Sequence, residues 1–213
     1  MTARNRSSAL FDRWSVTYDD PTLQRFTYRP IHDAVLARVD GTEPGTLVDL
    51  GCGTGRLTQR LLRSFPDATV VGVDLSGGML TEAAARLRGA AGEAGPLVQA
   101  DAQQLPFAAS TVDLVVCTES FHWYPDQART LSELARVLHP GGRLLIASIA
   151  TLTGAGDRLL RRATGAGGRT VRALPPQRMR QLLTGSGFEV IHQRRIPRLG
   201  LLAWPVLTDA RRT

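Results

Sequence analysis

Short apolar runs alternate with stretches of helical character along most of the chain. Five runs are rich in β-branched and aliphatic residues and are flanked by turn-forming residues, which is typical of buried strands. They are residues 46–50, 68–74, 97–101, 112–119 and 142–148. Residues 57–65, 79–87 and 126–138 lie between these runs and are predicted to be helices. This alternation predicts an α/β fold, with a mostly parallel sheet and helices on both faces.

Both ends of the chain add to this pattern. Apolar residues with helical spacing follow Pro30 and continue to Val39, and turn-forming residues at 40–45 end that helix. Residues 1–45 are therefore predicted to be mostly helical.

The C-terminal part predicts one more helix over residues 177–183. Residues 188–196 and 199–207 are apolar enough to pair as a final hairpin. The segment 150–176 contains five glycines, which indicates a mobile connection more than a rigid pocket.

Composition is that of an ordinary soluble domain. The 213 residues suit one domain, with 43% hydrophobic and 21% charged residues. No apolar run approaches the roughly 20 residues that span a bilayer, and the N-terminus has no apolar signal region. We therefore expect a cytoplasmic protein without a membrane span. Cys52 and Cys117 have neither zinc nor disulfide spacing and are expected to be reduced, partly buried thiols.

The formal net charge is +7, and every basic residue other than histidine is arginine. The densest basic stretch, residues 158–180, has no aromatic residue between its arginines. Nucleic-acid surfaces usually interleave basic and aromatic side chains, so we expect no nucleic-acid partner. A solvated face is the favoured interpretation of these arginines, and an anionic acceptor held by them is the alternative.

Candidate chemistry gathers where the predicted strands end, because ligands of parallel sheets bind beside the carboxyl ends of the strands. Gly51, Gly53 and Gly55 alternate between the first strand and the next helix. Glycine permits positive φ and a close approach of ligand to backbone, and a helix N-terminus attracts a carboxylate or phosphate. Alone, this loop fits several cofactors, including a nicotinamide dinucleotide.

The ends of the next two strands favour a nucleoside. A carboxylate at Asp74 can accept hydrogen bonds from both ribose hydroxyls, and the alternative role is a helix N-cap. Asp101 can reach an adenine amino group, or it can cap its own loop. Leu75, Met79 and Ala102 are placed to form an apolar slot for the adenine ring.

Four ordered motifs together resemble the class I S-adenosylmethionine (SAM)-dependent methyltransferases. The motif VDLGCGTG (48–55) is similar to the first motif of that family, and VVGVDLSGGML (70–80) to the second. The segment QADAQQLPFAASTVDLVVC (99–117) is similar to the third and fourth motifs, and ELARVLHPGGRLLIAS (133–148) to a later helix–turn–strand signature. Within the class, the chain is similar to the type 11 group related to ubiquinone/menaquinone-biosynthesis and trans-aconitate methyltransferases.

This resemblance implies a Rossmann-like, seven-stranded, mostly parallel sheet whose last strand is antiparallel. Residues 1–45 would form a helical cap, and residues 46–213 the SAM-binding methyltransferase domain. The implied contacts to SAM, or to its product S-adenosylhomocysteine, come from the strand ends, the glycine loop and the cap. They are Tyr18, Asp49, Gly51, Gly53, Gly55, Asp74, Leu75, Met79, Asp101, Ala102, Gln103, Thr118 and Glu119.

The resemblance also implies individual roles. Asp49 and Gly51 would lie beside the methionine part of SAM, and the next two glycines would keep the loop open. Thr118 and Glu119 would line the floor near the sulfonium. Tyr18 would close over the methionine end, or alternatively pack against the edge of the sheet. No metal is expected, because none of the four histidines has metal-ligand spacing.

His122 follows the fourth strand, at a position that would face the transferable methyl group. Its unperturbed pKa near 6.5 suits a general base that deprotonates the acceptor. The favoured alternative is that His122 and Trp123 form a wall of the pocket. SAM is already an activated sulfonium, so positioning alone can supply much of the barrier reduction.

The leading hypothesis is therefore a SAM-dependent methyltransferase that acts on O, N or C of a small-molecule acceptor. A natural product or quinone-like metabolite is the expected acceptor, and the protein is expected to be a monomer or homodimer. One alternative is a catalytically silent SAM-binding or assembly protein. Another is an NAD-dependent oxidoreductase, which is disfavoured because Arg56 occupies the third glycine position of G-x-G-x-x-G.

Overall fold

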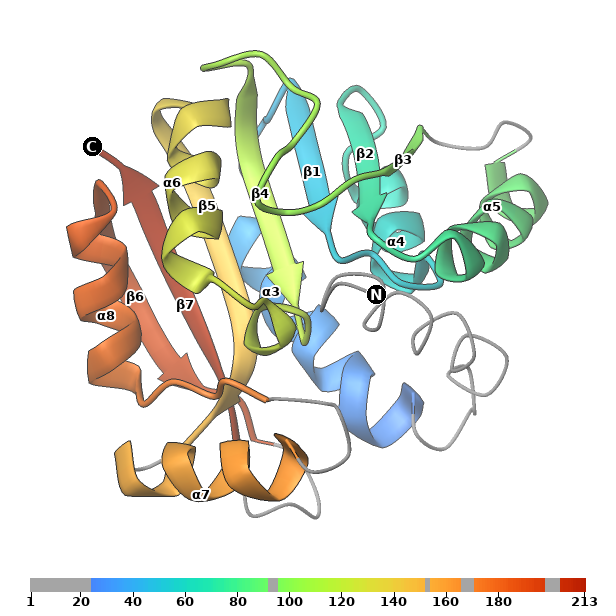
Figure 1. The fold of residues 1–213 in the computed structure, drawn as a ribbon. Coiled ribbons are helices and arrows are strands. Elements are labelled where there is room, and N and C mark those ends of the chain that lie inside the picture. Colours follow the sequence, from blue (N-terminus) through green and yellow to red (C-terminus); the bar gives the residue numbers. More distant parts are fainter. Residues whose placement is uncertain (1–23, 92–95, 152–153, 166–170, 198–203) are drawn as a thin grey trace.

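The computed structural model describes residues 24–91, 96–151, 154–165, 171–197 and 204–213 (Figure 1). Its strands are β1 (Thr46–Leu50), β2 (Thr69–Asp74), β3 (Leu97–Gln99), β4 (Val112–Thr118), β5 (Leu138–Ala150), β6 (Phe188–Arg195) and β7 (Trp204–Arg212). Its helices are η1 (Gln24–Tyr28), α3 (Arg29–Val39), α4 (Arg56–Ser64), α5 (Gly77–Ala91), η2 (Phe121–Trp123), α6 (Gln127–Val137), α7 (Gly154–Gly165) and α8 (Pro176–Gly185).

The strands form one seven-stranded sheet in the order β3-β2-β1-β4-β5-β7-β6. β1 to β5 pair in parallel, whereas β7 runs antiparallel to both of its neighbours, β5 and β6. The predicted mostly parallel sheet with an antiparallel last strand is confirmed. After β3 the chain returns to the other side of β1, so the strand order reverses between β1 and β4. Ligands of such sheets bind beside this reversal.

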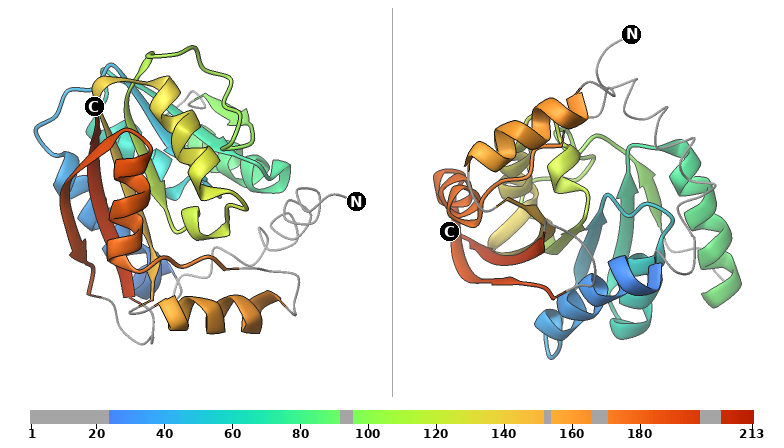
Figure 2. Two further views of the ribbon diagram at one scale, coloured as in Figure 1. Left: turned by 60° about the vertical axis from the view of Figure 1, so that its left-hand side comes forward. Right: turned by 90° about the horizontal axis from the view of Figure 1, so that it is seen from below.

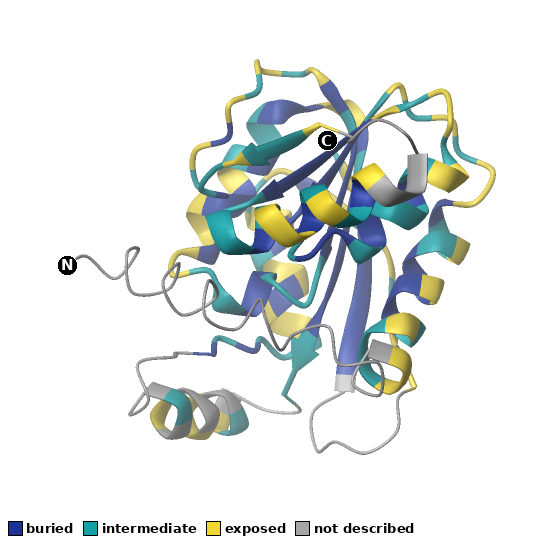
Figure 3. Cartoon of the chain, turned by 90° about the vertical axis from the view of Figure 1, so that its right-hand side faces the viewer, coloured by how far each residue is buried: buried dark blue, intermediate teal, exposed yellow. Residues whose placement is uncertain are grey.

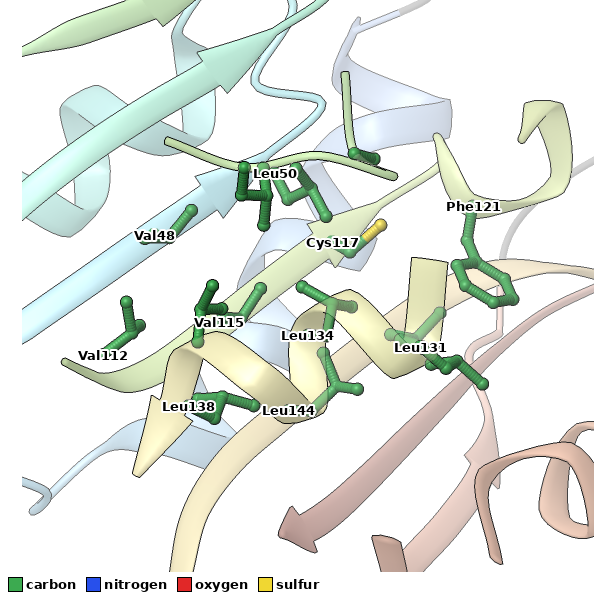
Figure 4. Packing of buried hydrophobic residues seen from close by; sticks show 14 of the residues in the cluster. Val48, Leu50, Val112, Val115, Cys117, Phe121, Leu131, Leu134, Leu138 and Leu144 are labelled. Atoms are coloured by element: carbon green, nitrogen blue, oxygen red, sulfur yellow. The ribbon is translucent and has the colours of Figure 1, made fainter. Parts of the chain in front are cut away.

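Helices α6 and α8 cover one face of the sheet, as Figure 2 shows. Leu131 and Leu134 of α6 pack in the same hydrophobic cluster as Val48 of β1 and Val115 of β4 (Figure 4). Leu183 of α8 belongs to this cluster too. The central strands are therefore locked to α6 and α8 by aliphatic packing.

Helices α3 and α4 cover the opposite face. Ile31 of α3 and Leu61 of α4 share a second cluster with Leu47 and Val116. Consecutive strand residues thus face different cores, which explains why the central strands are continuously apolar. Figure 3 shows the buried sheet between helices whose outer residues are exposed.

Two C-terminal predictions are corrected by the structure. The last strand covers 204–212, not 199–207, and residues 199–203 lie outside the described part of the chain. The polar residues Thr208 and Asp209 made this stretch resemble a loop, yet both are buried. Residues 154–165 form helix α7 within the stretch predicted to be a mobile connection. Good helix formers occupy the positions between its glycines.

The ionic contacts of Asp209 explain how a strand with polar residues can be buried in the sheet. Its side chain is 0% exposed, and its Oδ2 lies 2.7 Å from Arg38 Nη2 and 2.9 Å from Arg143 Nη2. Arg143 Nη2 also donates to the carbonyl oxygen of Arg38, at 3.2 Å. One buried carboxylate therefore connects α3, β5 and β7.

We predict that Asp209→Ala lowers the free energy of unfolding by about 3–5 kcal/mol, because it leaves two partly buried guanidinium groups without their counter-charge. Urea denaturation measures this change. Asp33→Ala is the matched control, since Asp33 is exposed and pairs with Arg60 on the surface; its effect should stay below about 1 kcal/mol. Similar losses in the two variants would contradict the role given to Asp209.

Candidate functional site

The carboxyl ends of β1, β2 and β4 meet at the lower edge of the sheet in Figure 1, beside the reversal of strand order. Leu50 pairs with Val73 of β2, and Asp49 pairs with Val116 of β4. The loops that follow these strands therefore start from adjacent positions, as the sequence predicted.

The glycine loop after β1 has a backbone that requires glycine. Gly51, Gly53 and Gly55 have φ angles of 72°, 55° and 76°, in the left-handed region. A Cβ on Gly51 would lie 2.5 Å from Ser120 Cβ, and a Cβ on Gly55 would lie 3.0 Å from Ala83 Cβ. A Cβ on Gly53 would meet no atom of the described residues within 4 Å. Gly51 and Gly55 thus permit close packing, and Gly53 faces open space.

Asp74, at the end of β2, holds the glycine loop in place. Its Oδ2 accepts a hydrogen bond from Gly53 N at 2.9 Å, and its Oδ1 accepts one from Ser76 N at 2.9 Å. The N-cap of α5 is Ser76, whose Oγ accepts from Met79 N at 3.1 Å. Ser76 therefore caps α5, and Asp74, for which an N-cap role was the alternative, instead orders the glycine loop and the turn that precede the helix.

The loop after β3 is ordered by Asp101. Its Oδ1 accepts a hydrogen bond from Gln103 N at 2.9 Å, and Asp101 forms a bridge with Gln104. Ala102 and Met79 are buried, whereas Leu75 is half-buried. The carboxylate thus caps its own loop, as the alternative reading of Asp101 expected.

Asp49 is buried at the end of β1, with 1% of its surface exposed. Its Oδ2 accepts a hydrogen bond from Thr58 Oγ1 at 2.6 Å, while Oδ1 has no hydrogen-bond partner among the described residues. Burial, and secondarily the negative charge of Asp74, raises the pKa of Asp49 to about 7 against the hydrogen bond from Thr58. Sequence patterns did not indicate Thr58, which lies in the first turn of α4.

The end of β4 turns sharply at Glu119. This residue has a φ of 51°, and its amide donates to the carbonyl oxygen of Ala147 at 2.7 Å. A non-glycine residue in the left-handed region costs on the order of 1–3 kcal/mol, and such strain clusters at functional sites. Thr118 and Glu119, both predicted site residues, are half-buried at this turn.

Ser120 joins the ends of β4 and β1, and the sequence did not identify it. Its Oγ donates to the carbonyl oxygen of Leu50 at 3.1 Å and lies 3.1 Å from both Tyr124 Oη and Cys117 Sγ. The pKa of Cys117 is raised to about 11 by burial, so the thiol stays protonated. Both cysteines are buried free thiols, in agreement with the predicted reduced state.

His122 is buried in η2, with 2% of its surface exposed. Its Nδ1 lies 3.0 Å from Ser148 Oγ of β5, and its ring packs against Trp123 with centroids 5.0 Å apart. The side chain is therefore held against β5 by Ser148 and against Trp123 of η2.

A second missed residue, Gln127, connects η2 to the chain that returns from α7. Its Nε2 donates to the carbonyl oxygens of Phe121 and Arg172, both at 3.0 Å. The amide of Arg172 donates to the carbonyl oxygen of His122 at 2.8 Å. The segment around Arg172 is thus fixed beside η2, and α7 lies beyond the carboxyl ends of the strands (Figure 1).

Some predictions fall outside these observations. Tyr18 lies outside the described residues. Within the described ranges, no group of three or more His, Cys, Asp or Glu side chains is arranged to hold a metal ion. In the same part of the chain, no helix combines the length and the apolar character needed to cross a membrane.

Residues 48–146 match the family described as "Methyltransferase domain". The chain is 39% identical over 137 residues to a trans-aconitate 2-methyltransferase from Methylobacterium nodulans, which covers 64% of this chain and 50% of the relative. It is 36% identical over 166 residues to a malonyl-[acyl-carrier protein] O-methyltransferase from Methylococcus capsulatus, which covers 76% of this chain and 59% of the relative. The matches therefore span between half and three-fifths of these relatives.

The fold has counterparts among solved structures. Magnesium protoporphyrin IX methyltransferase from Synechocystis PCC 6803, with bound S-adenosylhomocysteine, has a TM-score of 0.76 and 22% identity, and the match covers 100% of both chains. The sheet order, the ordered motifs and these similarities agree. Residues 48–146 are similar to the methyltransferase domain family, and the chain has the fold of the class I SAM-dependent methyltransferases.

Proposed function

We propose that this protein transfers a methyl group from SAM to a small-molecule acceptor. The observation that carries the proposal is the opening at Gly53, where the backbone borders open space at the N-terminus of α4. Asp74 fixes this backbone from β2, and at the start of the same loop Asp49 places a buried carboxylate oxygen that has no partner among the described residues. A cofactor with a ribose and a cationic amino-acid part matches these features.

The residues at this edge suit the parts of SAM. Asp74 would bind the ribose hydroxyls, while Asp49 and Gly51 would face the methionine part. Thr118 and Glu119 would lie near the sulfonium. We place the adenine among side chains that follow β2 and β3. Tyr18 would cover the methionine end of the cofactor. The adenine set is Leu75, Met79, Asp101, Ala102 and Gln103.

When bound, SAM supplies an activated methyl group on a sulfonium. The residues of this chain then need to orient the acceptor and exclude water. His122 acts as a wall, because it is buried and bonded to Ser148. The segment around Arg172 and helix α7 would border the acceptor, since both lie at the carboxyl end of the sheet (Figure 1).

The acceptor is proposed to be a small metabolite, by analogy with the named relatives. A trans-aconitate and a malonyl-carrier methyltransferase are both among them, which makes carboxylate-bearing compounds the first to test beside quinone-like ones. Formation of S-adenosylhomocysteine in a panel of such acceptors distinguishes an enzyme from a silent SAM-binding protein. Calorimetry with SAM, S-adenosylhomocysteine and NAD tests the cofactor directly. Binding of NAD alone would refute the proposal.

We predict that Gly53→Ala weakens SAM binding by at least tenfold, measured by calorimetry, because its Cβ would enter the space assigned to the cofactor. Gly141→Ala is the matched control. Gly141 also has a positive φ, 81°, and also faces open space, but it lies in the turn within β5. Both variants carry a backbone penalty of roughly 1–2 kcal/mol. Equal SAM affinities in the two variants would contradict the location of the site.

Asp74→Ala is expected to weaken SAM binding by about 1.5–3 kcal/mol, because two hydrogen bonds from the ribose to a charged acceptor are lost. Ser76→Ala serves as the control, since it removes the cap of α5 without removing the carboxylate. Its affinity should change by less than about threefold, a cost of roughly 0.6 kcal/mol. If both variants lose the same affinity, Asp74 acts only by ordering the loop.

His122→Ala should lower the rate at saturating SAM by less than about tenfold, since loss of a general base typically costs 10²–10⁴. The rate is followed as S-adenosylhomocysteine formed with an acceptor that the panel identifies. Ser148→Ala removes the hydrogen-bond partner of the ring and should have a similar effect on rate. A hundredfold loss in His122→Ala alone would establish His122 as the base.

A further inference from the structure

Two carboxylates lie close together at the ends of β1 and β2. Asp49 pairs with Gly72 of β2, two residues before Asp74, and the charge of Asp74 acts on Asp49. When two carboxylates share a buried site, one of them tends to keep a proton. The hydrogen bonds around each carboxylate decide which one does.

Asp74 is the better stabilised anion. Both of its oxygens accept hydrogen bonds from backbone N–H groups, those of Gly53 and Ser76, each at 2.9 Å. Among the described residues, Thr58 alone donates to Asp49, with its Oγ1 2.6 Å from Oδ2, while Oδ1 has no partner, and Asp49 is almost completely buried. Backbone donors favour the charged form and burial favours the neutral form. The proton therefore resides on Asp49.

The other groups around Asp49 do not supply a counter-charge. Cys52 of the glycine loop and Cys117 of β4 both interact with its charge, and burial raises the pKa of each thiol, so both are neutral at physiological pH. Tyr124, which contacts Cys117, also has a raised pKa because it is buried. From α4 the contact is the uncharged Thr58. In the described part of the chain, no arginine forms an ion pair with Asp49.

We propose that Asp49 releases its proton when the cofactor binds, and that the ammonium group of the methionine part of the cofactor replaces that proton as the positive partner of the carboxylate. This inference rests on the proposed SAM site. The exchange is balanced: the neutral carboxylic acid loses one proton to solvent, and the cationic ammonium stays protonated beside the resulting carboxylate. The oxygen of Asp49 that lacks a protein partner would accept the hydrogen bond.

The proposal sets the direction of two pH dependences. In the empty protein burial raises the pKa of Asp49 to about 7, well above the ordinary value for an aspartate. Below pH 7 binding must displace a proton, so cofactor affinity rises with pH and levels off above 7. Between pH 4 and 7 the folded empty protein holds a proton that the unfolded chain has lost, so Asp49 makes the empty protein less stable as pH rises through this window.

Calorimetry in two buffers of different ionisation enthalpy counts the protons released on binding. With S-adenosylhomocysteine, wild-type protein should release about 0.9 proton at pH 6 and about 0.1 at pH 8, as a group of pKa near 7 requires. The control ligand is 5′-methylthioadenosine, which lacks the amino-acid part and should release almost none. Equal release with both ligands, or no release at pH 6, would overturn the proposal.

Variants identify the residue that releases the proton when the ligand binds. Asp49→Asn should abolish the release, whereas Asp126→Asn removes a carboxylate that caps α6 outside the proposed cofactor site and should retain it. If Asp49→Asn does not fold, Thr58→Val provides a second test. It removes the hydrogen bond that lowers the pKa of Asp49, so the release should persist to higher pH. Full release in Asp49→Asn, or an unshifted profile in Thr58→Val, refutes the inference. Failure of wild-type protein to bind S-adenosylhomocysteine at all would instead refute the proposed function.

Discussion

The close approach of Gly51 to Ser120 is the constraint on which the candidate site depends. A side chain at position 51 would collide with Ser120, and Ser120 Oγ donates to the carbonyl oxygen of Leu50. The strained turn at Glu119 directs the chain from β4 into this contact. With the ends of β1 and β4 held together, the glycine loop lies where Gly53 reaches the carboxylate of Asp74.

Charge is distributed unevenly between the whole molecule and this edge. The chain has a net charge of +7, yet its central strands end in acidic residues, among them Asp49, Asp74 and Glu119. The overall charge acts at long range and is screened by salt, whereas the carboxylates act over a few ångströms in a partly desolvated site. A cationic ligand is therefore favoured locally by a protein that is itself cationic.

The sequence predicted the elements that depend on a local pattern of residues. It did not predict the features that depend on contacts between residues distant in the chain. The central strands and the helices around them were predicted correctly because strands buried on both faces are continuously apolar. The bounds of β7 were wrong, because Asp209 can be buried only with Arg38 and Arg143, which are distant in sequence. Ser120 and Gln127 were missed for the same reason, since their partners lie on other elements. The identity of the acceptor depends on shape and contacts that no local pattern encodes.

The position of β7 affects the order in which the sheet can form while the chain is being synthesised. β7 follows β6 in the chain but lies between β5 and β6 in the sheet. On the ribosome, β6 and the apolar side of α8 emerge before the strand that joins them to the rest of the molecule. Until residues 204–212 leave the exit tunnel, β6 has no strand partner on either side, and unpaired strands can associate with other chains. β6 can therefore join the sheet only after β7 has been synthesised.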